Sequence, residues 1–149
     1  MAVMRDHPYG RFNFLVDLGT GNTEGPEAGF QECSQIGMEV VLAEYRNGND
    51  KENNVRKIPG LTKYGDVTLR RGLIGSLSLY SWINDVRNGG QGVRTVTIQL
   101  MSEDHTSVVM TWKLLRARII KHVSGPLHAK GTDVAIEEIT LAYERLEIE

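Results

Sequence analysis

The stretch Val93–Leu115, with the sequence VRTVTIQLMSEDHTSVVMTWKLL, decides the class of fold. Between Val93 and Met101 apolar and polar side chains alternate, which is the period of a half-buried β-strand. The polar run Ser102–Ser107 predicts a turn, and Val108–Leu115 predicts a second strand that pairs with the first as a hairpin. This part of the chain is therefore predicted to be antiparallel β-structure.

One segment upstream of this hairpin has the period of an α-helix. Apolar residues recur three and four positions apart between Ser76 and Asn88, which predicts one apolar stripe. The stripe consists of Leu79, Trp82, Ile83 and Val86. Ser76 is the expected N-cap, and Gly89 is expected to end the helix in the left-handed conformation. We expect Trp82 to be a buried anchor that holds this helix against a sheet.

Short alternating runs elsewhere predict further strands, separated by glycine-rich loops such as Gly19–Gly29. These runs are Phe12–Leu18, Phe30–Ser34, Ile36–Tyr45, Tyr64–Arg71 and Ala117–Val123. The tail from Asp133 fits either a helix or a strand, and in a strand Glu137-Glu138 would form a bulge. The chain is predicted to be mainly β. We expect one domain over residues 1–149, a small antiparallel β-sandwich or barrel with one flanking α-helix.

The long polar segment Arg46–Gly60, RNGNDKENNVRKIPG, has no periodicity and predicts an extended loop. Loops of this length are uncommon in compact domains unless they have a function. The segment is either a plain solvated loop or an arm that becomes ordered on a neighbouring subunit. In the second case, the predicted interface residues are Asn47, Asn49, Asp50, Lys51, Val55, Ile58 and Leu61.

Bulk composition argues against several classes of protein. The 149 residues carry a net charge of −2, which gives no overall attraction to nucleic acid. Cys33 is the only cysteine, so no intramolecular disulfide can form, and this agrees with folding in a reducing cytoplasm. No secretory signal and no apolar run of about 18 residues is present, so we expect no stable membrane association.

No group of residues predicts a catalytic, metal or cofactor site. The histidines, His7, His105, His122 and His128, do not have the spacing of zinc ligands. Glu103-Asp104-His105 is better explained as a solvated hairpin tip. The basic pair Arg70-Arg71 protects an exposed strand, forms ion pairs across a subunit interface or contributes to a charged lumen. Trp112, like Trp82, is expected to be a core or interface anchor.

The segment Arg46–Gly72 resembles the inner-tube proteins of contractile phage tails and of extracellular contractile injection systems. The resemblance rests on IPGL at 58–61, KYGDVTL at 63–69 and Arg71-Gly72, followed by LYSWI at 79–83, VMTW at 109–112 and VAIEEITL at 134–141. These motifs occur in order over nearly the whole chain. The Gly19–Gly29 loop is longer and richer in glycine than the family pattern.

The resemblance implies a structural protein and not an enzyme. Six subunits would form a ring, and rings would stack into a hollow tube that sheath contraction drives through a target envelope. The implied partners are further copies of the chain, a sheath protein, baseplate and tail-terminating proteins, and cargo or DNA in the lumen. The protein would be made in the bacterial cytoplasm and assembled into a virion tail or injection particle. The resemblance also implies that the tail is a strand and that the loop at 46–60 reaches a neighbouring subunit.

Two other functions remain open at this point. A ring protein of a type VI secretion machine, which also carries effectors, would share the fold and would be distinguished by its genomic neighbours. A small β-barrel ligand-binding or hydrolytic domain would need a pocket with converging polar residues, which the sequence does not indicate. A monomer with a bound small molecule would favour that alternative.

Overall fold

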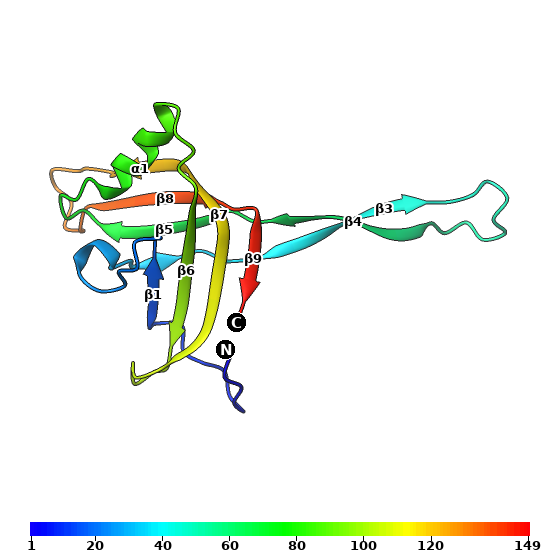
Figure 1. Ribbon diagram of the computed structural model, residues 1–149, viewed down its shortest axis with the longest axis horizontal. Coiled ribbons are helices and arrows are strands. Elements are labelled where there is room, and N and C mark those ends of the chain that lie inside the picture. Colours follow the sequence, from blue (N-terminus) through cyan, green and yellow to red (C-terminus); the bar gives the residue numbers. More distant parts are fainter.

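The computed structural model of the chain describes residues 1–149 and consists of a β-rich body from which a long two-stranded arm projects (Figure 1). The elements in order are β1 (Phe14–Asp17), the short 3-10 helix η1 (Pro26–Ala28), β2 (Glu32–Cys33), β3 (Met38–Tyr45), β4 (Arg56–Tyr64), β5 (Val67–Gly72), α1 (Ser78–Arg87), β6 (Arg94–Met101), β7 (Val108–Ser124), β8 (Ile136–Ala142) and β9 (Arg145–Ile148). The chain is therefore mainly β with one α-helix, as the sequence predicts.

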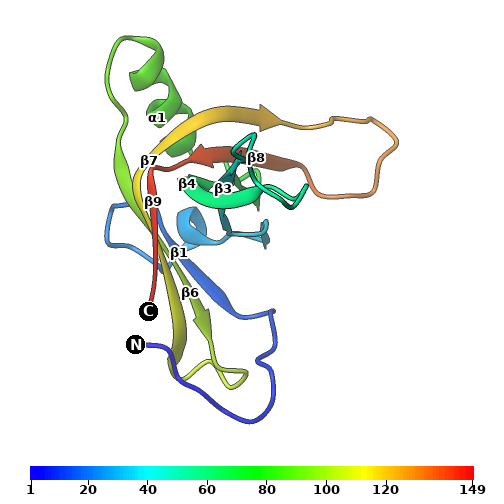
Figure 2. The ribbon, with the colours of Figure 1, turned by 90° about the vertical axis from the view of Figure 1, so that its right-hand side faces the viewer.

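The body consists of two layers of antiparallel strands that share the long strand β7. The first part of β7 pairs with β6 and β9, and β1 lies beyond β6. From Arg118 onwards β7 pairs with β8, which continues to β5 and β2. The strand changes layer next to Arg116, whose positive φ of 53° is unusual for a residue with a side chain. The two layers run in different directions in Figures 1 and 2.

The hydrophobic core lies between these layers. Its members come from both layers and from α1, and include Val16, Val67, Leu69, Leu79, Trp82, Val96, Ile98, Leu114, Ile139 and Leu141. The predicted hairpin at 93–115 is present as β6 and β7, with a turn between them. No helix is long and apolar enough to cross a membrane.

Helix α1 confirms the predicted apolar stripe. Leu79 and Trp82 are buried, and the Trp82 indole Nε1–H donates to the carbonyl of Gly92 at 2.6 Å. The helix ends before Gly89, whose φ of 97° is left-handed, as predicted. The prediction that Ser76 is the N-cap is wrong by one position, because Leu77 occupies the cap. The Ser76 hydroxyl still accepts from the Ser78 N–H at 3.3 Å.

The tail of the chain is β-structure, but without the bulge expected at Glu137-Glu138. Pairing of β5 with β8 is continuous from Gly72 opposite Ile136 to Val67 opposite Leu141. Glu137 takes a core-facing position that the alternation of apolar residues could not reveal, because its carboxylate is neutralised by a buried arginine on β5. The irregularity in pairing lies instead between β7 and β8.

The predicted loop at 46–60 is correct for residues 46–55, which form the turn of a β-hairpin, but its last five residues need correction. Only residues 46–55 form the turn, and Arg56–Tyr64 is strand β4, paired with β3. Pro59-Gly60, at the end of the predicted loop, lies within β4 at an irregularity in the ladder. A Cβ on Gly60 would lie 2.8 Å from the Val41 carbonyl oxygen, so glycine fits this β-bulge where other residues clash.

The boundaries of the predicted strands also shift. The run Tyr64–Arg71 is divided at residues 65–66, so that Tyr64 ends the arm and Val67 begins the body strand β5. The run Phe12–Leu18 shortens to β1, and Phe30–Ser34 shortens to the two residues of β2. Both short strands lie at free edges of the body, where pairing from one side only supports fewer residues.

Candidate assembly surfaces

The arm formed by β3, β4 and the turn at 46–55 exposes large apolar side chains on both of its faces. Exposed residues of this kind are Met38, Val40, Val41, Leu42, Tyr45, Val55, Ile58 and Leu61. In Figure 1 the arm extends away from the body, and it pairs with no other strand. An isolated two-stranded hairpin is marginally stable in water, and contiguous exposed apolar surface is typical of an interaction site. The arm is therefore the main candidate for an assembly surface.

The register assigns each arm residue to one of two faces, because directly opposite residues in an antiparallel pair share a face. One face, which we call face 1, carries apolar residues in its middle and an acid opposite a base toward the tip. Face 1 comprises Met38, Val40, Leu42, Glu44, Lys57, Pro59, Thr62 and Tyr64. The other face, face 2, includes Val41, Ala43, Tyr45, Arg56 and Ile58.

The tip of the arm is held together by its own polar groups. The guanidinium of Arg46 donates to the carbonyls of Glu52 at 3.0 Å and Asp50 at 2.9 Å. The Asp50 N–H donates to the Asn47 carbonyl at 3.1 Å, and the Asp50 carboxylate accepts from the Asn47 N–H at 3.1 Å. These bonds give the polar tip a defined shape without an apolar core.

The structure separates the predicted interface residues into two groups. Asn47, Asn49, Asp50, Lys51 and Val55 lie in the turn at the tip. Ile58 and Leu61 lie on β4, where their side chains are 48% and 78% exposed. The sequence-based set therefore omits β3, although Val40 and Leu42 expose as much apolar surface as Ile58. The signal that could have found them was the apolar run at 40–42, which has no polar alternation.

A second candidate surface is an open groove of about 640 Å³ in the body. Its walls come from the free edge strands β1 and β2 and from the faces of β6 and β7. The lining residues are Arg11, Phe12, Phe14, Gln31, Glu32, Cys33, Ser34, Ile36, Ile98, Leu100 and Trp112. Trp112, the second predicted anchor, is therefore half-buried at the groove, whereas Trp82 is part of the core. Phe12 is 67% exposed at the same place.

Cys33 lies in this groove as a free thiol. Burial, with a smaller contribution from the neighbouring Glu32 carboxylate, raises the pKa of Cys33 to about 11. The sulfur is therefore a neutral thiol at physiological pH and behaves as a small apolar group. This adds to the apolar character of the groove.

A buried ion pair between Arg71 and Glu137 connects β5 with β8, and Arg71 also contacts the 3-10 helix η1. The Arg71 Nε donates to Glu137 at 2.6 Å, and the two side chains are 1% and 4% exposed. Arg71 also donates to the carbonyl of Glu27 at 2.7 Å, and the second oxygen of Glu137 faces His122 Nε2 at 3.3 Å. Arg71 is thus not part of an exposed basic pair. It ties the Gly19–Gly29 loop to the sheet, whereas Arg70 stays partly exposed beside Glu32 and Glu138.

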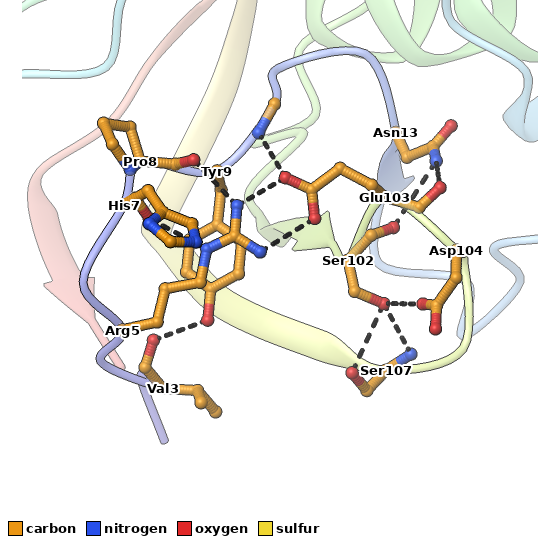
Figure 3. Close-up of polar contacts among 11 residues, drawn as sticks. Val3, Arg5, His7, Pro8, Tyr9, Asn13, Ser102, Glu103, Asp104 and Ser107 are labelled. Atoms are coloured by element: carbon orange, nitrogen blue, oxygen red, sulfur yellow. Dashed lines mark hydrogen bonds and ion pairs between the residues drawn. The ribbon is translucent and has the colours of Figure 1, made fainter.

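The N-terminal segment is attached to the turn between β6 and β7, as Figure 3 shows. The Arg5 guanidinium binds both oxygens of Glu103 and stacks 3.7 Å from the centre of the Tyr9 ring. Glu103 also accepts from the Gly10 N–H at 2.9 Å. These donors, Arg5 first, lower the pKa of Glu103 to about 2. Glu103, expected at a solvated hairpin tip, therefore binds the N-terminal segment.

No group of three or more His, Cys, Asp or Glu side chains is placed to hold a metal ion. Within the Glu103-Asp104-His105 cluster, the Asp104 carboxylate binds Ser102 at 2.5 Å and Thr106 at 2.8 Å, which lowers the pKa of Asp104. These contacts close the turn. The polar clusters described here thus bind other parts of the same chain.

Comparison with known proteins gives one family and a set of similar structures. The family described as T4-like virus tail tube protein gp19 matches residues 10–147. Among curated proteins, none matches the chain.

Solved structures of contractile injection systems have the same fold. A chain from the sheath-tube complex of PVC, an extracellular contractile injection system, superposes with a TM-score of 0.83 and 28% identity, covering 97% of this chain and 93% of that one. A chain from the tube-terminating cap of the anti-feeding prophage has a TM-score of 0.83 and 26% identity, covering 100% and 95%. Hcp1 from Flavobacterium johnsoniae shares the fold alone. It has a TM-score of 0.56 and 11% identity, covering 91% of this chain and 93% of that one.

Proposed function

This chain belongs to the T4-like virus tail tube protein family, and we propose that its copies form rings that stack into the inner tube of a contractile tail or injection system. The inner-tube role agrees with the similarity to chains of PVC and the anti-feeding prophage. The observation that carries the proposal is the arm, which exposes apolar side chains on two faces and pairs with no other strand. Such a surface becomes stable when further copies cover it.

The number and partners of the copies are part of the same proposal. We expect six subunits in a ring, as the family resemblance implies. A surrounding sheath and a terminating protein are expected partners, because the similar chains come from a sheath-tube complex and from a sheath and tube terminator. Baseplate proteins, and cargo or DNA in the lumen, complete the expected set. We expect the chain to be made in the cytoplasm and then assembled into a virion tail or an injection particle.

The type VI alternative is less well supported. The likeness to Hcp1 is one of fold, at a TM-score of 0.56, whereas the PVC tube chain superposes at 0.83. The difference agrees with the phage-type motif at 58–72. A structural role without catalysis, metal or nucleotide remains our expectation for the assembled protein, and ring formation in the presence of EDTA tests it.

Deletion of residues 49–54 tests the proposal through the arm tip. Negative-stain microscopy of the purified wild-type chain is expected to show rings and tubes. The deletion leaves all body strands intact, so the variant should fold and form rings that do not stack, since Asn49, Asp50 and Lys51 are missing from the predicted interface. Tubes of normal length from the variant would show that the tip has no role in stacking. A wild-type chain that stays monomeric would contradict the inner-tube function itself.

A further inference from the structure

The tripeptide Arg-Asn-Gly occurs twice in the chain, at residues 46–48 in the arm tip and at residues 87–89 at the end of helix α1. Asparagine followed by glycine is prone to spontaneous deamidation, because glycine lets its own backbone nitrogen approach the asparagine side chain. The two local sequences are identical, so a difference in their reactivity comes from the structure. We propose that Asn47 is a site of succinimide formation and deamidation in the free subunit, whereas the fold protects Asn88.

The reaction at Asn47 needs only water. The backbone N–H of Gly48 loses its proton to hydroxide, and the nitrogen forms a bond to the side-chain carbon Cγ of Asn47. The bond between Cγ and the amide nitrogen breaks, and the leaving nitrogen takes a proton from water and departs as ammonia. Water then opens the cyclic imide at one of its two carbonyls. Opening at the side-chain carbonyl gives aspartate, and opening at the main-chain carbonyl gives isoaspartate.

The attacking nitrogen is free at one site and bonded at the other. The Gly48 N–H donates to no carbonyl or side chain, because the bonds of Asn47 to Asp50 use only the N–H and the carbonyl of Asn47. Figure 1 shows this tip at the far end of the arm, away from the body. The Gly89 N–H, by contrast, donates to the Val86 carbonyl at 3.1 Å. Attack by the Gly89 nitrogen must break that bond, which raises the barrier there.

Asn88 is also held by the end of helix α1. Its N–H donates to the Asn84 carbonyl at 3.0 Å, and the Gly90 N–H donates to the Asp85 carbonyl at 2.9 Å. Gly89 is fixed at a left-handed φ of 97° between these bonds. Ring closure requires the backbone on both sides of the asparagine to turn. At Asn88 this motion unwinds the end of the helix, so the fold opposes the reaction.

Tyr45 assists the attack in the arm tip. Its hydroxyl donates to the side-chain carbonyl oxygen Oδ1 of Asn47. That oxygen gains negative charge while the Gly48 nitrogen adds to Cγ, and a hydrogen-bond donor aimed at it stabilises the charge. No side-chain donor contacts Asn88, so this activation is specific to the tip.

Deamidation changes the shape and charge of the tip, and its effect on assembly rests on the proposed function. Either product places a carboxylate next to Asp50, whose own carboxylate accepts from the Asn47 N–H at 3.1 Å. Isoaspartate also adds a methylene to the backbone, which displaces the carbonyl that accepts from the Asp50 N–H. A subunit that has aged before assembly therefore loses the tip structure and stacks less well than a fresh one.

Peptide mass spectrometry of the full-length protein tests the site. Free subunits are separated from assembled protein by sedimentation and incubated at neutral pH, and isoaspartyl methyltransferase labels the isoaspartate product. Asn47 should deamidate roughly tenfold faster than Asn88, about the factor that one hydrogen bond contributes. In urea the two sites should react at similar rates, because their local sequences match. Equal rates in the folded protein would overturn the proposal.

Two variants test the chemistry. A Cβ on Gly48 meets nothing within 4 Å, and the φ of Gly48 is not left-handed, so Gly48→Ala fits without strain. The added methyl hinders the approach of the nitrogen and should slow deamidation of Asn47 roughly tenfold. An unchanged rate would exclude the succinimide route. Tyr45→Phe should slow the reaction several-fold, whereas Tyr80→Phe on helix α1 is the control. Equal rates in these two variants would overturn the assistance by Tyr45.

A third comparison separates the site from its effect on assembly. Asn47→Asp reproduces one product and should lower the assembled fraction several-fold, whereas Asn88→Asp, the matched control, should not. Normal tubes from Asn47→Asp would overturn the effect on stacking and leave the deamidation site standing. A wild-type chain that deamidates at Asn47 but never assembles would contradict the proposed function alone.

Discussion

The body and the arm use the same kinds of apolar residue in opposite ways. In the body, Val67 and Leu69 on β5 are completely buried between two layers. In the arm, Val40 and Leu42 on β3 are about half exposed, although both β3 and β5 are paired strands. The body therefore contains the interactions that stabilise a single subunit, whereas much of the apolar surface of the arm stays in contact with water until another copy covers it. Substitutions in the two regions should separate folding from assembly.

The largest expected effect on folding comes from Trp82 in the body. Trp82→Ala removes a side chain that is 2% exposed together with its hydrogen bond to Gly92, and should lower the free energy of unfolding by about 3–5 kcal/mol. Urea denaturation measures this change. Tyr80→Ala on the same helix, where the side chain is 44% exposed, should change stability by less than about 0.5 kcal/mol. Equal effects of the two variants would contradict the burial of the helix stripe.

A smaller effect is expected at the buried ion pair. Glu137→Gln keeps the size of the side chain but leaves the Arg71 charge without its partner, and should cost roughly 2–3 kcal/mol of unfolding free energy. Glu138→Gln, the next residue on β8 with a side chain 32% exposed, is the matched control and should cost less than about 1 kcal/mol. If both variants unfold at the same urea concentration, the ion pair does not contribute to the stability of the body.

The arm should show the reverse behaviour. Ile58→Ser changes a side chain that is 48% exposed, so the unfolding free energy of a free subunit should change by less than about 0.5 kcal/mol. Assembly should nevertheless decrease, since Ile58 is one of the predicted interface residues. Analytical ultracentrifugation measures the assembled fraction. Unchanged assembly with reduced subunit stability would mean that β4 contributes to folding and not to contacts between copies.

The smallest expected effect concerns the N-terminal segment and depends on pH. The pKa of Glu103 is lowered to about 2 from its ordinary 4.5, so the contribution of the Arg5 contact is complete above pH 4.5 and is lost as the pH falls toward 2. The groups are exposed, so the global stability should change little. The Gly10 amide resonance should shift over this pH range in the wild-type chain. In Glu103→Gln the Gly10 amide resonance should already have its low-pH position at neutral pH. A Gly10 resonance that does not shift with pH in the wild-type chain would exclude the contact.

Local sequence patterns determined most of the body. Alternation at 93–115 is sufficient for β6 and β7, because a strand with one buried face needs an apolar residue at every second position. The stripe through Leu79 and Trp82 determined the helix, and Gly89 determined its end. The motif at 58–72 carried the resemblance to the family, although the lack of periodicity at 46–60 did not reveal that strand β4 begins at Arg56.

Only the tertiary structure decided the features that depend on contacts between distant segments. Arg56–Tyr64 becomes a strand because β3 pairs with it, despite a proline and a glycine that locally favour a turn. Glu137 is buried because Arg71, 66 residues away in the sequence, supplies the opposite charge. The groove combines β1, β2, β6 and β7, which no local pattern places together. Periodicity records which face of a segment is apolar, whereas pairing and charge neutralisation depend on which segments meet in the folded chain.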